Sequence, residues 1–211
     1  MSDLGPMGAG FDDAVQQSQA IFRCVLDAMA RPGTCHEIPD MPYAPAPLNA
    51  ACTAIALTLL DDSTPVWLDP VADTRPVREF LSFHCGCPIV TAPSDGAFAI
   101  VAGAIPPLVS FNPGSDEFPE NSTTIVAQVE RLETGTAITL SGPGIDGVTA
   151  IGDPGLPKDF WLQRMELEPL YPCGVDIILT AQHRLACMPR SVQRVDLRTK
   201  KPNEENQNPC T

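Results

Sequence analysis

Apolar side chains recur at helical spacing in four segments of the chain, and this periodicity predicts four helices. The first helix runs from Phe11 to the Arg-Pro-Gly stop at residues 31–33, with Asp12 or Asp13 near its N-cap. Its apolar positions fall on one stripe, which consists of Phe11, Val15, Phe22, Val25, Leu26 and Met29.

The other three predicted helices differ in how apolar they are. Residues 48–62 are apolar nearly all round, so this helix is expected to be buried, with Asn49 as its cap. A helix over about residues 73–85 tolerates Pro76 in its first turn. Residues 158–168 form the fourth helix, which carries Phe160, Trp161, Leu162 and Met165.

Short apolar or alternating runs between the helices predict strands. The predicted strands are 34–38, 64–70, 87–91, 97–103, 123–132, 135–141, 148–152, 174–180 and 184–189. Those at 123–132 and 135–141 alternate as half-buried strands do, and the last two form a hairpin that turns at residues 181–183. Because strands and helices follow one another in mixed order, we expect a sheet with both parallel and antiparallel neighbours, covered by helices.

The length and composition of the chain favour one domain. With 211 residues, 44% of them hydrophobic, the chain can bury a substantial core. The domain is expected to span residues 11–197, after a flexible N-terminus at 1–10 and before a disordered polar tail at 198–211. An acidic loop is predicted at residues 106–122.

The net charge of −13 argues against several classes of partner. Sequence-independent binding to nucleic acid or to an anionic membrane needs a surplus of lysine and arginine. No apolar run approaches the roughly 20 residues that span a bilayer, and the first ten residues lack the basic and apolar regions of a signal peptide. We therefore expect a cytoplasmic protein whose eight cysteines are free thiols, several of them buried.

Residues 140–147, LSGPGIDG, place three glycines in a loop after a predicted strand. A phosphate cradle needs a run of free backbone N–H groups, usually at the start of a helix. Pro143 removes one N–H from this loop, no Lys-Ser/Thr pair follows it, and residues 148–152 continue as a strand. The glycines are therefore expected to turn the chain rather than to bind a phosphate.

Asp176 interrupts an apolar strand, and a buried carboxylate must find a partner. The predicted turn pairs Thr180 with Arg184. This register sets Asp176 opposite Met188, and Arg190 then lies within reach on the diagonal. We favour an ion pair that fixes the register of the hairpin. The alternative is an anion site in which Asp176 holds Arg190 ready for a ligand.

The segment His84-Cys85-Gly86-Cys87 supplies three side chains that can bind a metal. Its C-x-C spacing differs from the C-x-x-C of a zinc site, and no matching second pair exists in the sequence. His84 also shares a helical face with Phe80 and Leu81, so we favour a core or interface histidine and no bound metal. A metalloprotein that uses His84 and Cys87 is the alternative.

Lysine is scarce, since the sequence contains Lys158, Lys200 and Lys201 alone, and the last two lie in the predicted tail. A Schiff-base mechanism normally needs a desolvated lysine, whereas Lys158 lies in a predicted polar turn. The scarcity argues against pyridoxal chemistry. No G-x-S-x-G or H-E-x-x-H motif occurs, so hydrolase and metalloprotease functions have no support in the sequence.

Several segments together resemble the PhnH family, whose members are subunits of the bacterial carbon–phosphorus lyase system. The segments are FRCVLDAMARPG, PLNAACTAIALTLLDDSTPVWL, FLSFHCGCPIV, LSGPGI and YPCGVDIILTAQHRLACMPRSVQRV. The resemblance extends in the same order from Phe11 to Leu197. The sequence departs from the family pattern at Cys85, where threonine is common, and at Ser191, within the usual Pro-Arg-Thr-Thr ending. The first departure weakens any metal role for the cysteines.

The resemblance implies a three-layer α/β/α sandwich with a mixed sheet, similar to pyridoxal-phosphate-dependent transferases but lacking the cofactor. It implies a homodimer that acts in phosphonate breakdown with PhnG, PhnI, PhnJ and PhnK. With PhnG, PhnI and PhnL, the family supports formation of α-D-ribose 1-methylphosphonate 5-triphosphate from ATP and methylphosphonate. Nucleosidase chemistry is attributed to PhnI and radical cleavage to PhnJ, so no catalytic residue carries over to this chain.

We therefore expect an accessory α/β subunit, without a cofactor, whose role is assembly. The side chains expected at a ligand or partner contact are Arg31, His84, Asp176 and Arg190. The acidic composition suits a partner with basic patches. The alternative is an independent enzyme that binds a phosphonate or a nucleotide through these arginines.

Overall fold

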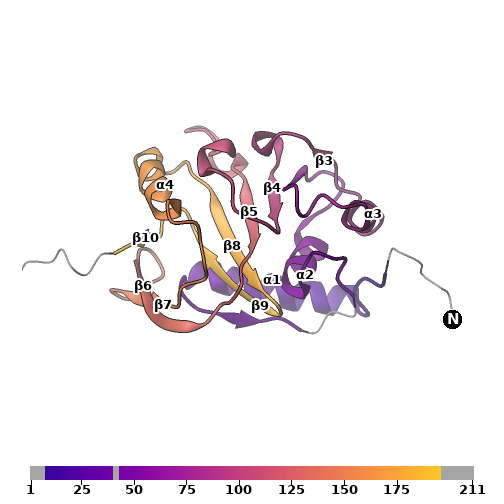
Figure 1. The fold of residues 1–211 in the computed structure, drawn as a ribbon, viewed down its shortest axis with the longest axis horizontal. Coiled ribbons are helices and arrows are strands. Elements are labelled where there is room, and N and C mark those ends of the chain that lie inside the picture. The colour runs from indigo at the N-terminus through magenta and orange to yellow at the C-terminus, as the bar shows by residue number, and fades with distance from the viewer. Residues whose placement is uncertain (1–7, 40–42, 196–211) are drawn as a thin grey trace, which may run out of the picture.

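A seven-stranded mixed sheet forms the centre of the structure (Figure 1). The computed structural model describes residues 8–39 and 43–195, so residues 1–7 of the predicted flexible N-terminus and the whole predicted tail at 198–211 lie outside the described residues. The strand order is β1-β9-β8-β5-β4-β2-β3. These strands are β1 (His36–Glu37), β2 (Val66–Leu68), β3 (Ile89–Val90), β4 (Phe98–Val101), β5 (Thr124–Gln128), β8 (Asp176–Ala181) and β9 (Arg184–Met188).

The direction of the strands confirms the predicted α/β fold with a mixed sheet. The five strands from β8 to β3 run parallel to one another. Strand β9 is antiparallel to β8, and β1 is antiparallel to β9. Helices connect several of the parallel strands, as parallel neighbours require.

The central strands are apolar because both of their faces are covered. In β5 the consecutive residues Ile125, Val126 and Ala127 are all buried, whereas a half-buried strand buries every second residue. The prediction of an alternating, half-buried strand at 123–132 is therefore wrong. Strand β5 lies between β4 and β8 in the parallel part of the sheet, where both faces pack against other elements.

A separate three-stranded antiparallel sheet has the order β10-β6-β7. Its strands are β6 (Thr134–Ser141), β7 (Thr149–Ile151) and β10 (Gln193–Arg194). Strands β5 and β6 follow each other in the sequence but belong to different sheets. Strands β3 and β4 are also apart, because β2 lies between them and pairs with both in parallel.

Two hydrophobic clusters cover the two faces of the large sheet. One cluster joins α1 (Ala14–Ala30), α2 (Ala50–Leu59) and α3 (Arg75–His84) to sheet residues such as Val126 and Ile178. The other joins α4 (Phe160–Leu167), the short helix η3 (Leu108–Ser110) and the small sheet to residues such as Ile125 and Ile177. Figure 1 shows α4 with β6, β7 and β10 on the left and α2 and α3 on the right. The remaining short helices are η2 (Pro93–Asp95), η4 (Pro119–Asn121) and η5 (Glu168–Leu170).

Side-chain caps begin the first three helices. Asp13 Oδ1 accepts from the Gln16 N–H over 3.0 Å, and Asn49 Oδ1 accepts from the Cys52 N–H over 2.8 Å. Both caps were predicted, and α2 is buried from Ala51 to Ala56 as its composition indicates. The cap of α3 is Thr74, so this helix begins later than predicted. Within residues 8–39 and 43–195, no helix combines the length and hydropathy that crossing a bilayer requires.

The apolar stripe predicted for α1 is divided between two faces of the helix. The residues that pack inward are Ile21, Val25 and Ala28. Phe22 and Leu26 are 45% and 52% exposed, and Val15 is 77% exposed. Phe22 and Leu26 each follow a buried position by one residue, which turns them about 100° away from the sheet. The prediction of a single stripe is wrong, because the sheet contacts only the part centred on Val25.

The β8–β9 hairpin has a tighter turn than predicted. Its two-residue turn is Gln182-His183, and Gln182 adopts a left-handed φ of 54°. Ala181 therefore pairs with Arg184, and Ile177 rather than Asp176 pairs with Met188. The predicted register is wrong by one residue, since a two-residue turn with positive φ matches the twist of the strands better than the predicted three-residue turn.

The Gly-Pro-Gly segment after β6 is a turn that leads to β7, as predicted. Gly144 has a φ of +82°, and a Cβ built there would lie 2.1 Å from the Ala30 carbonyl oxygen. This loop therefore packs directly on the C-terminus of α1. Gly147, in the same loop, has a φ of +70° and nothing within 4 Å of such a Cβ.

We predict that Gly144→Ala lowers the free energy of unfolding more than Gly147→Ala does. Both changes incur the cost of a left-handed backbone, about 1–2 kcal/mol, but only Gly144→Ala also forces the loop away from α1. Urea denaturation followed by circular dichroism measures the difference. Equal losses for the two variants would contradict the described contact between the loop and Ala30.

Candidate functional site

Asp176 and Arg190 form an ion pair between the start of β8 and the segment after β9. The Arg190 backbone N–H donates to Asp176 Oδ1 over 2.7 Å, and Arg190 Nη2 donates to Oδ2 over 2.6 Å. The side chains are only 17% and 22% exposed. The structure thus brings this predicted pair together, although the register of the hairpin differs.

The guanidinium of Arg190 is fully occupied by protein acceptors. Its Nη1 donates to the carbonyl oxygens of Pro119 and Pro172, over 2.8 and 3.1 Å. Its Nη2 donates to Ser122 Oγ as well as to Asp176, and its Nε donates to Asp176. Because a guanidinium has five N–H donors, none remains for a ligand. The contacts favour the structural alternative, in which the pair joins the loop before β5 to the loop before β8.

Arg164 is a second arginine close to this region, and it was not among the predicted contact residues. It lies on the buried face of α4 with 8% exposure, while Leu162 and Met165 on the same helix are exposed. Its guanidinium donates to the carbonyl oxygens of Pro189 (2.6 Å) and Val192 (2.8 Å). Burial lowers its pKa to about 10, so it is charged at neutral pH. An arginine within an amphipathic helix carries no sequence signal that distinguishes burial from exposure.

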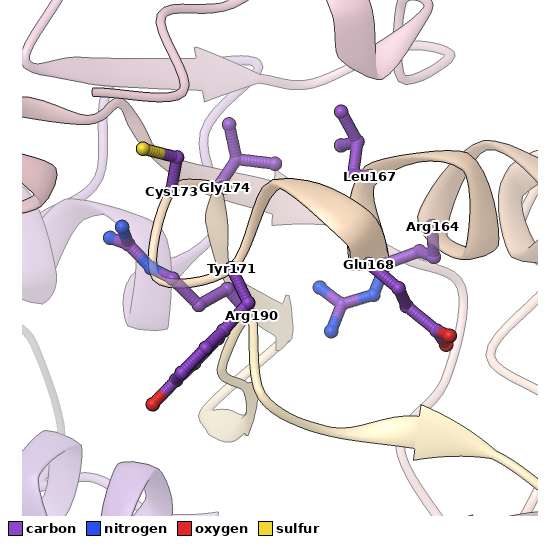
Figure 2. Close-up of a pocket in the computed structure, with 8 residues that line it drawn as sticks. Arg164, Leu167, Glu168, Tyr171, Cys173, Gly174 and Arg190 are labelled. Carbon is purple, nitrogen blue, oxygen red and sulfur yellow. The ribbon is translucent and has the colours of Figure 1, made fainter. Parts of the chain in front are cut away.

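A small cavity lies between these two arginines. Figure 2 shows that their guanidinium groups lie apart and do not point toward each other. Cys173, Tyr171 and Glu168 also line the cavity. Its volume is about 20 Å³, which is enough for about one water molecule. A phosphonate or nucleotide therefore has no room between Arg164 and Arg190 in this structure.

The other two predicted contact residues lie elsewhere. Arg31 caps the C-terminus of α1 and pairs with Asp27, and its side chain is 62% exposed. His84 ends α3, where its ring lies 4.4 Å from that of Phe80 and 4.9 Å from that of Phe83. The structure therefore gives His84 an aromatic environment, and no contact joins Arg31 or His84 to the Asp176–Arg190 pair within the described residues.

Cys85 and Cys87, which follow His84, contact other groups of the protein. The Cys85 Sγ donates to the Ala56 carbonyl oxygen over 3.7 Å, and Cys87 is buried. A hydrogen bond with the Cys87 thiol, together with burial, raises the pKa of Cys85. Within residues 8–39 and 43–195, no three His, Cys, Asp or Glu side chains gather closely enough to hold a metal ion.

Asp69 is a buried carboxylate that the sequence analysis did not single out. It follows β2 and is 2% exposed. Its Oδ1 accepts from the N–H groups of Ala72 (2.8 Å) and Ala102 (3.0 Å), and its Oδ2 accepts from the Gly103 N–H (3.0 Å). Strand β3 is added on one side of β2, and the next strand, β4, is added on the other side. Ligands of open α/β sheets usually bind at such a switch point, here between β2 and β4. Here Asp69 engages the backbone donors that a phosphate would use.

A cleft of about 590 Å³ lies beside this point, at the carboxyl ends of β4 and β5. Its walls are residues 102–105 after β4, residues 128–130 at the end of β5, and residues 155–157 before α4. Glu130 is its charged group. The size suits a small molecule, but the lining supplies no cation for a polyphosphate.

We predict that Arg190→Lys lowers the free energy of unfolding by roughly 2–4 kcal/mol, because lysine keeps the charge but cannot satisfy all of the Arg190 acceptors. Arg184→Lys is the matched control. Its pair with Glu37 is exposed, so the loss should be below about 1 kcal/mol. Urea denaturation of both variants measures the two losses in free energy of unfolding. Similar losses would show that the Asp176–Arg190 contacts stabilise the fold no more than an exposed ion pair does.

Comparison with known proteins identifies relatives of this chain. A family model described as "Bacterial phosphonate metabolism protein (PhnH)" matches residues 9–195. The chain is 36% identical over 188 residues to "Alpha-D-ribose 1-methylphosphonate 5-triphosphate synthase subunit PhnH" of Rhizobium meliloti (strain 1021), which covers 87% of this chain and 92% of that protein. It is 38% identical over 78 residues to "Putative C-P lyase subunit protein HtxG" of Stutzerimonas stutzeri, covering 37% and 40% of the two chains. The chain therefore belongs to the PhnH family of bacterial phosphonate metabolism proteins.

Proposed function

We propose that this chain is a subunit of a carbon–phosphorus lyase system for phosphonate catabolism. Its relatives are named as a synthase subunit and as a putative C-P lyase subunit. In this proposal the chain, together with PhnG, PhnI and PhnL, supports formation of α-D-ribose 1-methylphosphonate 5-triphosphate from ATP and methylphosphonate. It acts in the cytoplasm, and PhnJ and PhnK are further partners.

The proposed role is assembly, and the exposed apolar side chains of α1 carry this proposal. Val15, Phe22 and Leu26 form a line along the outer side of the helix, which we call the α1 stripe. Aligned exposed apolar side chains commonly mark a protein contact. We propose that the α1 stripe packs against the same stripe of a second copy in a homodimer.

The four predicted contact residues take different parts in this proposal. Arg31 is exposed at the end of α1 and His84 is half-buried at the end of α3, and both are proposed to contact a partner there. Asp176 and Arg190 shape a surface indirectly, because Arg190 fixes the loops that carry the exposed Phe118 and Tyr171. The acidic composition favours partner surfaces with basic patches, which raise the rate and specificity of association.

The proposed fold relationship is a three-layer sandwich like that of pyridoxal-phosphate-dependent transferases, without the cofactor. The hydrophobic clusters with helices on both faces of the large sheet support the layered part of this proposal. Asp69 engages backbone N–H groups that a cofactor phosphate would need, which supports the part without the cofactor. The alternative function, an independent enzyme that binds its substrate through Arg31 and Arg190, draws no support from these contacts. Arg190 has its donors engaged, and Arg31 is paired with Asp27.

We predict that the double variant Phe22→Glu, Leu26→Glu converts a homodimer into a folded monomer, because the added charges would face each other across the interface. Size-exclusion chromatography with light scattering measures the mass. Gln16→Glu adds a charge on a different exposed face of α1 and should leave the dimer intact. A dimeric double variant, or a wild-type chain that is monomeric, would contradict the proposed dimer.

We also predict that the tagged full chain co-purifies with PhnG, PhnI and PhnJ of the same bacterium when all are expressed together. Formation of the ribose methylphosphonate product from ATP and methylphosphonate should fall when this chain is left out. Phosphorus NMR follows the product. Undiminished product formation without the chain would overturn the proposed function.

A further inference from the structure

Most cationic side chains of the described chain already have a protein partner. The arginines that form ion pairs with carboxylates are Arg31, Arg75, Arg78, Arg184 and Arg190. The buried Arg164 donates to carbonyl oxygens. Within residues 8–39 and 43–195, the cations that form no ion pair and are not buried are Arg23, Arg131, Lys158 and Arg194, and the last two line one pocket.

This pocket, which we call the α4–β10 pocket, has a volume of about 200 Å³. Lys158 precedes α4, Trp161 lies in the first turn of α4, and Arg194 ends β10. The guanidinium carbon of Arg194 lies 5.8 Å from the centre of the Trp161 ring, which is a cation–π distance. Trp161 is itself buried, so its ring gives the arginine a fixed support. Ile138 and Leu156 add apolar surface.

The charges around the α4–β10 pocket sum to a positive value although the whole chain is acidic. Asp153 also lines the pocket, and its Oδ1 accepts from the Gly155 N–H over 2.9 Å. Arg131 Nε donates to the carbonyl oxygen of Asp153 over 3.4 Å, which brings a further cation close by. Among the lining residues Lys158 and Arg194 outweigh Asp153, and Arg131 offsets Asp159, which follows Lys158 directly. At physiological ionic strength charges beyond about 8 Å are largely screened, so this local balance governs what binds.

We propose that the α4–β10 pocket binds the oxyanion of a phosphate or phosphonate group. Arg194 can donate two N–H groups to two oxygens of a tetrahedral anion, and Lys158 can approach a third as a point charge. The volume is below the roughly 300–1,000 Å³ of sites that enclose a drug-sized ligand, so one anionic group enters rather than a whole nucleotide. Leu156 and Pro157 also line the larger cleft beside β4 and β5, into which the remainder of a ligand can extend.

The test is binding of inorganic phosphate, methylphosphonate and ATP to the full chain at low ionic strength. Isothermal titration gives the affinity, and fluorescence of Trp161 reports occupancy of the pocket, since Trp161 lines the pocket and the other tryptophan, Trp67, does not. We expect Lys158→Gln and Arg194→Gln each to weaken binding about tenfold, as the loss of one charged hydrogen bond should. Tighter binding of ATP than of phosphate and methylphosphonate would assign the group to a nucleotide, and the reverse to a free phosphonate or phosphate.

Three controls make the outcome decisive. Arg23→Gln removes an equal charge from an exposed site on α1 and should leave binding unchanged. Asp153→Asn removes the opposing carboxylate and should tighten binding. Arg190→Gln should alter stability but not the fluorescence response of the folded protein. Absence of binding by all three probes, or equal effects of Arg23→Gln and Arg194→Gln, would overturn the proposal.

The choice of methylphosphonate and ATP as probes rests on the proposed function. The proposal that the pocket binds an anion rests instead on the positions of Lys158, Arg194 and Trp161. Variants of Lys158 and Arg194 are expected to assemble normally with PhnG, PhnI and PhnJ. Their pocket adjoins Trp161 and Ile138 of one hydrophobic cluster, whereas α1 packs in the cluster on the opposite face of the large sheet. Binding without assembly would leave the pocket standing and overturn the subunit role. Assembly without binding would do the opposite.

Discussion

The parallel strands at the centre of this protein are held at both ends by buried or half-buried carboxylates. At the amino ends, Asp176 accepts hydrogen bonds from the backbone N–H and the guanidinium of Arg190. The remaining N–H groups of Arg190 donate to the loops that lead into β5 and β8. At the carboxyl ends, Asp69 accepts three backbone N–H groups from the loops after β2 and β4. Each carboxylate would be costly to bury alone, so each requires these partners. The conformations of the loops around the sheet therefore depend on hydrogen bonds to buried carboxylates as well as on apolar packing.

This arrangement bears on where a PhnH-family chain can act. Open α/β sheets commonly bind ligands at the carboxyl ends of their strands, and here the backbone donors beside β2 and β4 are engaged by Asp69. The arginine that the sequence marks most clearly, Arg190, is engaged in the same way. The groups that remain lie farther out: apolar side chains on α1, which suit a protein partner, and two cations beside α4, which suit an anion. A chain of this design is suited to contacts with other subunits, which is the basis of the proposed role.

Several features were predictable because they depend on neighbours in the sequence. The caps Asp13 and Asn49 act on N–H groups three residues away, and the Gly-Pro-Gly turn follows from residues with special backbone preferences. The Asp176–Arg190 pair was predictable because a hairpin brings nearby segments together. The partners Ser122, Pro119 and Pro172 were not, since nothing local to Arg190 indicates which distant loop will supply its acceptors.

The sequence by itself determined that the chain is an α/β protein with a mixed sheet, a buried second helix and an Asp–Arg ion pair beside its last hairpin. Tertiary structure decided which face of α1 packs inward, that β5 and β6 enter different sheets, and that Lys158 and Arg194 share a pocket. The physical reason is the range of the interactions. Periodicity, capping and turn preferences act within a few residues, whereas strand pairing and the satisfaction of buried charge depend on segments that meet only in the folded chain.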